Sequence, residues 1–403
     1  MGNSASSALP YSIGTEEFPA KYTAHNTGWA IHNGSQKSNP SQPVTVFKFS
    51  KSANAVSSPN PLDAEVRLLA AQHHFQKIKT LVHPHLLRAY ATLDTDNPDG
   101  SVATGIGSTS TAKEVAQKGD FIVVTEHVIP LSAYLNQIVH SADEAENNAQ
   151  VINSTIAWGL VTVIEALHFL HSNAQLSHGR VCIDSIYVTS GGDFKLGDFS
   201  LLTRIDSSSA ASTSISSLPR LFTDLQRTLT PKNFMSPERL EQRWDLVSAC
   251  PPHIMDSYSM GILIQELYTS FSKAGSVPQK LVKAVQRLTT SNVKLRPRLS
   301  PLLKCPVFKE DAFVQSQSVL DNLSAKPAEE KIAFLQRLPD LLTRNVIHKK
   351  AAEFKVLPEL TRSVEGILGS GQTTGGVIQQ DVSRRESKSC QNSYFILVNL
   401  LLH

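Results

Sequence analysis

The sequence lacks cysteine pairs, long apolar runs and an excess of one charge, and each absence excludes a class of protein. Its four cysteines are scattered without a CxxC pair, so we expect neither a disulfide framework nor a zinc site, and a reducing, cytosolic setting fits best. No apolar run approaches the roughly 18 residues of a membrane span. The nearest, residues 395–402, is short and contains Asn399. The net charge of +3 over 403 residues is too small to argue for nucleic-acid binding.

The N-terminus also lacks a cationic stretch followed by an apolar one, so no secretory signal is expected. It reads MGNSAS, in which Gly2 and Ser6 match the M-G-x-x-x-[ST] pattern for N-myristoylation at Gly2; the alternative is a disordered polar leader. One myristoyl chain gives only marginal membrane affinity, and no Lys or Arg precedes Lys21 to add a polybasic signal. We therefore expect any membrane attachment to be reversible, or to be helped by another part of the protein.

The length of 403 residues exceeds one average domain, and a hydrophobic content of 41% is that of a globular protein, so two or more packed units are expected. Residues 1–20 read as a flexible leader. A hairpin is predicted at Asn33-Gly34, between WAIH and the strand VTVFKF. Period-two alternation predicts two faces for that strand, one with Val44, Val46 and Lys48 and the other with Thr45, Phe47 and Phe49.

The patterns farther along the chain alternate between packed segments and polar ones. They predict, in order, a helix over 61–81, an exposed insertion over 95–119, a buried strand over 121–128, a helix capped at Ser154 with an apolar face from Ile156 to Leu170, a disordered loop over 206–217, and helices over 256–268 and 278–303.

Beyond about Cys305 the pattern is helical, with one helix beginning near Pro327 and another over 355–368. These two read as the beginning of stacked helical pairs, although they are fewer than the three or more repeats that a solenoid needs. After Gly369 the pattern is lost, so residues 369–403 are expected to form an atypical, disordered tail.

The most informative stretch is HGRVCIDS, from His178 to Ser185, which is followed by FKLGDFS over 194–200. It resembles the catalytic loop of protein kinases, in which the Asp of HRD accepts a proton and an Asn holds magnesium. Here those two positions are Arg180 and Ser185. A guanidinium has no lone pair and stays protonated, so Arg180 cannot act as a general base.

Eight segments follow one another in the order that they have in protein kinases: VTVFK, LVHPHLL, FIVVTEHV, HGRVCIDS, FKLGDFS, MSPERL, DSYSMGILIQEL and LRPRL. In this set the chain resembles the SCYL family of pseudokinases, also called N-terminal-kinase-like proteins. The resemblance implies an α+β, bilobal protein-kinase-like domain over residues 21–310, followed by the start of a helical HEAT-like region over 311–368.

The resemblance implies a degraded nucleotide site. The glycine-rich loop is reduced to GWAIHNG, and His74 stands where the helix Glu is expected. The matched positions are Lys48 for the strand lysine, Val46 for the small residue over the adenine, Thr125 for the gatekeeper, Glu126 for the first hinge residue and Asp198 for the magnesium ligand. Two alternatives stay open, a strand lysine that points to solvent at Lys48 and a turn-capping role for Asp198.

Scaffold positions of the kinase fold are better preserved than the chemical ones. The resemblance implies a packed core role for His178 and a buried ion pair between Glu238 and Arg296. Asp256, at the start of a helix, matches the residue that ties down the catalytic loop in kinases. The chain is therefore predicted to keep the fold without the transfer chemistry, and to be a pseudokinase rather than an enzyme.

The leading functional hypothesis is a scaffold or adaptor that requires no cofactor. The resemblance implies a role in Golgi to endoplasmic reticulum vesicle traffic through protein partners such as vesicle coat factors. It also implies a cytoplasmic location, with peripheral contact at Golgi membranes through the myristoyl group.

Two alternatives belong to other classes. One is a weak or atypical ATP-binding Ser/Thr kinase that uses Lys48 and Asp198 to hold ATP, with or without magnesium. The other is a tRNA-export adaptor, which would need a basic face. Lys349-Lys350 and Arg384-Arg385 are too sparse for one, so charge argues against tRNA.

Overall fold

The computed structural model of the chain describes residues 9–18, 27–57, 61–97, 119–140, 145–204, 229–347 and 349–361. Gly2, the loop predicted over 206–217, the tail predicted over 369–403 and most of the insertion predicted over 95–119 lie outside these ranges. The chain divides into two units. The first comprises residues 1–141, 162–189 and 194–302, and the second comprises 142–161, 190–193 and 303–403.

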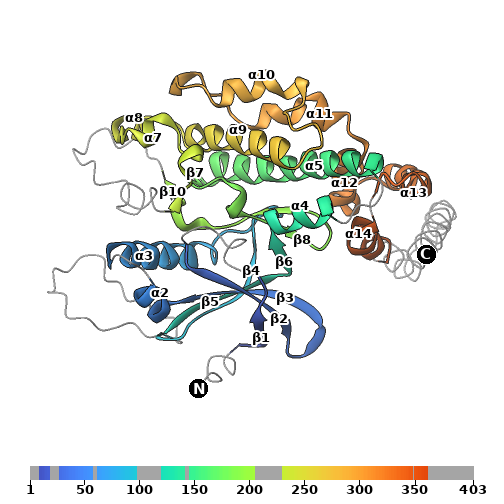
Figure 1. Cartoon of the computed structure of the whole chain (residues 1–403). Coiled ribbons are helices and arrows are strands. Elements are labelled where there is room, and N and C mark those ends of the chain that lie inside the picture. The colour runs from blue at the N-terminus through green and yellow to red at the C-terminus, as the bar shows by residue number, and fades with distance from the viewer. Residues whose placement is uncertain are drawn as a thin grey trace. The chain divides into compact units, whose positions relative to one another are not determined.

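A five-stranded antiparallel sheet with the order β1-β2-β3-β5-β4 forms one end of the first unit (Figure 1). Its strands are β1 (Tyr11–Glu16), β2 (Trp29–Gln36), β3 (Asn39–Ser50), β4 (Ala89–Asp94) and β5 (Asp120–Glu126), accompanied by the helices α2 (Lys51–Ser57) and α3 (Pro61–Lys77). Because β1 belongs to this sheet, the leader predicted over residues 1–20 is too long.

The predicted hairpin exists between β2 and β3, but its turn is not at Asn33-Gly34. Asn33 and Gly34 lie inside β2, paired with Thr45 and Val44 of β3. A side chain at Gly34 would place its Cβ 2.5 Å from the Ser12 carbonyl oxygen, so this glycine permits a close approach of β1 rather than a turn.

The alternation predicted for β3 is confirmed by the sheet. Val44 and Val46 share a buried cluster with Ile122 and Val124 of β5 and with Leu9. Phe47 and Phe49 are buried on the other side, where Phe47 contacts Tyr187 and Phe49 contacts Trp29. We call the Phe47 side the inner face and the Val46 side the outer face.

The rest of the first unit is mostly helical, with two small sheets. Its elements are β6 (Val128–Pro130), β7 (Leu176–Ser177), β8 (Ile186–Thr189), β9 (Phe194–Leu196), β10 (Thr203–Arg204), α4 (Leu131–His140), the end of α5 (Ala145–Ser172), α7 (Pro237–Leu240), α8 (Trp244–Ser248), α9 (His253–Ser270) and α10 (Gln279–Leu288). Together with the five-stranded sheet, this arrangement confirms the predicted α+β class.

Helix α5 begins earlier than predicted, so Ser154 is an interior residue rather than a cap. Its hydroxyl donates to the Asp311 carboxylate at 2.7 Å within the second unit. Residues Ala149–Ser172 of this helix are long and apolar enough to cross a membrane, but most of this stretch is buried inside the structure, as expected for a core helix.

The second unit contains α11 (Pro306–Lys309), α12 (Ala312–Asp321), α13 (Ala328–Thr343) and α14 (Lys349–Ala351), which continues into a π-helical turn at Ala352–Val356. One lysine ties its parts together. Lys355 Nζ lies 2.6 Å from the Asp193 carboxylate and 2.7 Å from that of Asp321, and 4.7 Å from the centre of the Trp158 ring. The helix predicted to begin near Pro327 is present, with Pro327 at its N-cap.

Candidate functional site

The loop that begins at His178 is held by the buried carboxylate of Asp256, which lies in the first turn of α9. Its Oδ2 accepts the backbone N–H of His178 at 2.7 Å, and its Oδ1 accepts that of Gly179 at 2.9 Å. His171 and Ser177 donate to the same carboxylate. Burial would raise the pKa of Asp256, but these donors and the neighbouring His171 outweigh it and lower the pKa. Asp256 therefore has the tethering role predicted for it.

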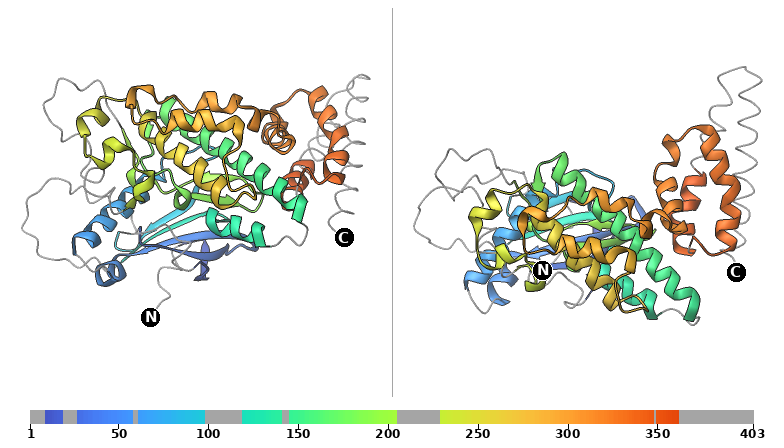
Figure 2. Two further views of the ribbon diagram at one scale, coloured as in Figure 1. Left: turned by 45° about the horizontal axis from the view of Figure 1, so that its top comes forward. Right: turned by 90° about the horizontal axis from the view of Figure 1, so that it is seen from above.

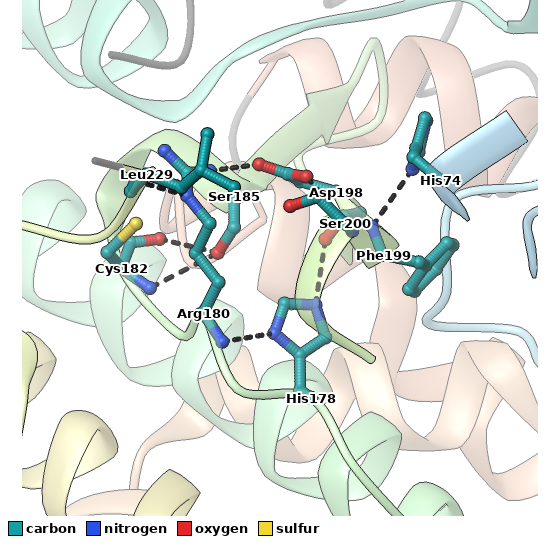
Figure 3. A network of polar contacts seen from close by, with 10 residues as sticks. His74, His178, Arg180, Cys182, Ser185, Asp198, Phe199, Ser200 and Leu229 are labelled. Carbon is teal, nitrogen blue, oxygen red and sulfur yellow. Dashed lines mark hydrogen bonds and ion pairs between the residues drawn. The ribbon is translucent and has the colours of Figure 1, made fainter. Parts of the chain in front are cut away.

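The side chain of Arg180 points back into the protein and pairs with Asp198 (Figure 3). Arg180 is fully buried, and Asp198 is 5% exposed. The Arg180 Nε also donates to the Leu229 carbonyl at 2.7 Å. Burial would raise the pKa of Asp198, but the guanidinium outweighs it and holds that pKa below its usual value. The residue that replaces the catalytic Asp thus neutralises the residue that matches the magnesium ligand.

His74 of α3 binds the backbone next to Asp198 (Figure 3). Its Nδ1 accepts the N–H of Phe199 at 2.9 Å, and the two rings stack at 5.8 Å between centroids. Burial lowers the pKa of His74 to about 4, so the imidazole is neutral at pH 7. His74 therefore acts as a neutral hydrogen-bond acceptor where a kinase has a carboxylate.

His178 and Ser185 are both bonded within the loop region. The His178 Nε2 lies 2.8 Å from the Gly197 carbonyl, while its Nδ1 accepts the Arg180 N–H, so the ring is a neutral core residue as predicted. The Ser185 hydroxyl donates to the Cys182 carbonyl at 2.8 Å and accepts the N–H of Cys182 at 3.2 Å. Ser185 therefore binds the backbone of its own loop. It also lacks the amide oxygen with which an Asn at this position binds magnesium.

Lys48 and Val46 were predicted to contact a nucleotide, and the structure corrects this. Both lie on the outer face of the sheet, where Val46 joins the apolar cluster of Val44. The Lys48 ammonium lies 3.1 Å from the Asp120 carboxylate, and its side chain is 37% exposed. The alternative of a strand lysine near solvent therefore describes Lys48, because one residue along a strand changes the face.

On the inner face, aromatic side chains stand at the positions that flank Lys48. The rings of Phe47 and Tyr187 meet edge to face, with their centroids 5.1 Å apart, so β3 and β8 are in direct contact there. Trp29 lies 5.6 Å from Phe49 and 5.2 Å from His74, again between ring centroids. A cluster of three rings, those of Phe49, Trp29 and His74, thus replaces the strand-to-helix ion pair that the kinase resemblance implies.

Thr125 and Glu126 are the last two residues of β5, so the strand predicted over 121–128 ends two residues early, and the Thr125 hydroxyl is already bonded. It is fully buried and donates to the carbonyls of Glu126 at 2.8 Å and Thr45 at 3.4 Å. The Glu126 carboxylate lies 3.5 Å from Lys195. The partners of these two side chains are therefore residues other than Asp198.

The predicted ion pair between Glu238 and Arg296 is present and buried. Two guanidinium nitrogens reach the two carboxylate oxygens at 2.6 and 2.8 Å, and Ser236 donates to Glu238 at 2.6 Å. Burial would raise the pKa of Glu238, but the bonds from Arg296 and Ser236 outweigh it and lower the pKa. This pair joins α7 to the turn after α10.

These residues do not fit a magnesium nucleotide. The carboxylate of Asp198 is bound by a fixed cation, Ser185 is bonded to Cys182, and Lys48 lies on the other face of the sheet. Within the described ranges no group of three or more His, Cys, Asp or Glu side chains could hold a metal ion. The site is a closed set of internal contacts, which we call the Arg180 network: Arg180, Asp198, His74, His178 and Phe199.

Sequence reasoning missed Phe47, Phe49 and Trp29 as the residues of the inner face. The alternation of β3 groups Lys48 with the valines, but it does not show which face is the inner one, because both faces are apolar. The nucleotide contact of Lys48 was predicted from the residue type at the motif position, without regard to the face of the strand on which Lys48 lies.

No family model matches the chain. The chain is 26% identical over 370 residues to the probable inactive serine/threonine-protein kinase scy1 of Dictyostelium discoideum. The matched region covers 90% of this chain and 38% of that protein. It is 23% identical over 362 residues to the SCY1-like protein 2 of Homo sapiens, covering 83% of this chain and 36% of that protein. The chain therefore spans little more than a third of the length of these relatives. The predicted resemblance to the SCYL family is confirmed.

Among solved structures, the crystal structure of Cex1p is similar with a TM-score of 0.59 and 17% identity, over 98% of this chain and 58% of that one. At this identity the likeness shows the fold alone.

Proposed function

Because the chain is similar to SCY1-like proteins over most of its length, we propose that it is a pseudokinase that works by binding other proteins, as a scaffold or adaptor. The observation that supports this most strongly is the buried ion pair between Arg180 and Asp198. It removes the general base and neutralises the matched metal ligand in one contact.

The electrostatics of this pair argue against phosphoryl transfer. A guanidinium cannot take a proton from a substrate hydroxyl. The fixed positive charge of Arg180, which lies against Asp198, also repels a divalent cation at the place where the kinase resemblance would put one. The retained contacts, Asp256 with the loop and Glu238 with Arg296, stabilise the fold and need no substrate.

The finer parts of the proposal rest on the family resemblance. We propose that the protein acts in vesicle traffic between the Golgi and the endoplasmic reticulum, through partners such as coat factors. The helices of the second unit would begin a HEAT-like region that extends the binding surface. Myristoylation of Gly2 would give a cytoplasmic protein peripheral contact with Golgi membranes.

A phosphotransfer assay with the purified chain tests the central part. The assay contains labelled ATP, magnesium and a general protein substrate. We expect the wild-type chain to incorporate no more labelled phosphate than an Asp198→Asn variant, because the Asp198 carboxylate is already paired with Arg180 and does not hold magnesium. Incorporation by the wild-type chain that disappears in Asp198→Asn would overturn the proposal. It would favour the weak kinase that remains the alternative.

A further inference from the structure

The part of the chain that follows α9 is strongly basic, although the net charge of the whole protein is only +3. Residues 267–302 contain seven Lys and Arg residues and no Asp or Glu. Arg296 is buried against Glu238, whereas the other six side chains are exposed. These six are Lys273, Lys280, Lys283, Arg287, Lys294 and Arg298.

Helix α10 presents three of these cations on one face. Lys280, Lys283 and Arg287 are spaced by three and four residues, so they lie along one side of the helix. The buried residues Leu281, Val285 and Leu288 lie on another side, toward α9. There the approach is close, since a Cβ at Gly261 would come within 3.0 Å of the Leu288 Cβ. Figure 2 shows α10 beside α9 at the edge of the first unit. The side chains of Lys280, Lys283 and Arg287 are exposed.

The turn after α10 adds two more cations and an exposed leucine. Arg296 holds this turn in place, because its Nε donates to the Thr290 carbonyl at 2.8 Å and its other nitrogens bind Glu238. On either side of this anchor, Lys294 and Arg298 are exposed, and Leu295 is 64% exposed. An apolar side chain thus projects between two cations from a rigid turn.

We propose that this basic face, formed by Lys280, Lys283, Arg287, Lys294 and Arg298 with Leu295, docks the protein on an anionic lipid membrane. A segment whose cations have no Asp or Glu between them in the sequence matches a diffuse layer of lipid phosphates and carboxylates. An exposed leucine can enter the interface between headgroups and acyl chains. The inference deepens the membrane part of the proposed function. It names the second signal that a single myristoyl chain requires.

Two other partners fit these observations less well. Single-stranded nucleic acid needs aromatic side chains on which bases stack. The two aromatic residues of this segment are Tyr268, which is buried, and Phe271, which is only partly exposed. Recognition of carboxylates in an acidic peptide favours the fork of arginine, and most of the exposed cations here are lysines, which act as point charges.

The test is a sedimentation assay with the unlipidated full chain and vesicles. The unlipidated chain is used so that any binding comes from the protein surface and not from a myristoyl group at Gly2. We expect binding at 50 mM salt to phosphatidylcholine vesicles containing phosphatidylserine at one lipid in five. Binding should be lost at 500 mM salt and absent with pure phosphatidylcholine. Each cation near such a surface contributes roughly five-fold in affinity, so the Lys280→Glu, Lys283→Glu, Arg287→Glu variant should bind about a hundred-fold more weakly or worse.

A matched variant controls for net charge. Arg88, Lys232 and Arg337 are exposed and lie outside the basic segment, so Arg88→Glu, Lys232→Glu, Arg337→Glu should bind vesicles within a factor of a few of the wild type. Leu295→Ser should weaken binding several-fold and leave its salt dependence unchanged. Both triple variants should unfold within a few degrees of the wild type.

Three outcomes would overturn the proposal. The first is equal binding to neutral vesicles or none to anionic ones, and the second is an equal loss in both triple variants. The third is tighter binding to a short RNA duplex than to vesicles at the same salt, removed by the α10 variant alone, which would assign the face to RNA. None of these outcomes depends on whether the protein transfers phosphate, so failure here is distinct from failure of the pseudokinase proposal.

Discussion

Two buried arginine–carboxylate pairs in the first unit make an instructive comparison. Arg296 with Glu238 joins α7 to the turn after α10, at a place where the kinase resemblance implies such a pair. Arg180 with Asp198 has the same chemistry and similar burial, but it lies where a kinase would place its base and its metal ligand. At the positions that match a kinase's reaction centre, the second pair therefore makes a structural contact like that of the first pair.

The comparison indicates how a kinase-shaped site can be stabilised without nucleotide. Arg180 supplies the positive charge beside Asp198, His74 accepts the Phe199 N–H, and Phe47 meets Tyr187 across the inner face. Of these contacts, the one from Arg180 satisfies the carboxylate that a kinase uses to hold magnesium. The two pairs therefore differ in their position in the fold, while the interaction that stabilises them is the same. Substitutions in each pair can test this.

The largest effect is expected at the scaffold pair. Arg296→Met would leave Glu238 buried without its cation and should lower the free energy of unfolding by about 3–5 kcal/mol, measured by urea denaturation. Arg298→Met, two residues away and exposed, is the control and should change the free energy by about 0.5 kcal/mol or less. Equal effects of the two variants would show that the buried pair contributes nothing special.

A nearly equal effect is expected at Arg180, and it would support the comparison. Arg180→Met should cost about 3 kcal/mol, because an isolated Asp198 can relieve part of its burial by taking up a proton. The double variant Arg180→Met, Asp198→Asn should recover more than half of that loss, since no buried charge remains. If Arg180→Met were as stable as the wild type, the Arg180 network would not be a stabilising core.

The network should also give the protein a pH dependence through His74. Its pKa is about 4 in the folded protein against an ordinary 6.5, so between these values the unfolded chain takes up a proton that the folded chain excludes. The contribution of neutral His74 is fully present above about pH 6.5 and is lost as the pH falls toward 4. Between pH 7.5 and 5 the wild type should lose about 2 kcal/mol more than His74→Gln, whose amide oxygen can still accept the Phe199 N–H. Identical pH profiles of the two proteins would contradict this assignment.

The smallest effect is expected at Lys48. Its pair with Asp120 is partly exposed, so Lys48→Ala should change the free energy of unfolding by less than about 1 kcal/mol. The same substitution should leave the response to ATP unchanged. A nucleotide effect that depends on Lys48 would restore the original prediction for this residue.

The sequence predicts the fold far better than it predicts the site. Eight kinase-like segments in order indicate the architecture, and residues with one physical role, such as Asp256 and the Glu238–Arg296 pair, lie where they were expected. Lys48 was misplaced because both faces of β3 are apolar, one with valines and one with phenylalanines, so hydrophobicity alone does not say which face is inner. The partner of Arg180 depends on a fold that brings two loops together, and spacing along the chain does not reveal it.

The central claim is that internal contacts already occupy the place of a magnesium nucleotide. Its most direct test is isothermal titration calorimetry of the purified wild-type chain with ATP up to millimolar concentration, with and without magnesium. The account predicts no saturable heat of binding under either condition. Saturable binding that requires magnesium and is abolished by Asp198→Asn would contradict it.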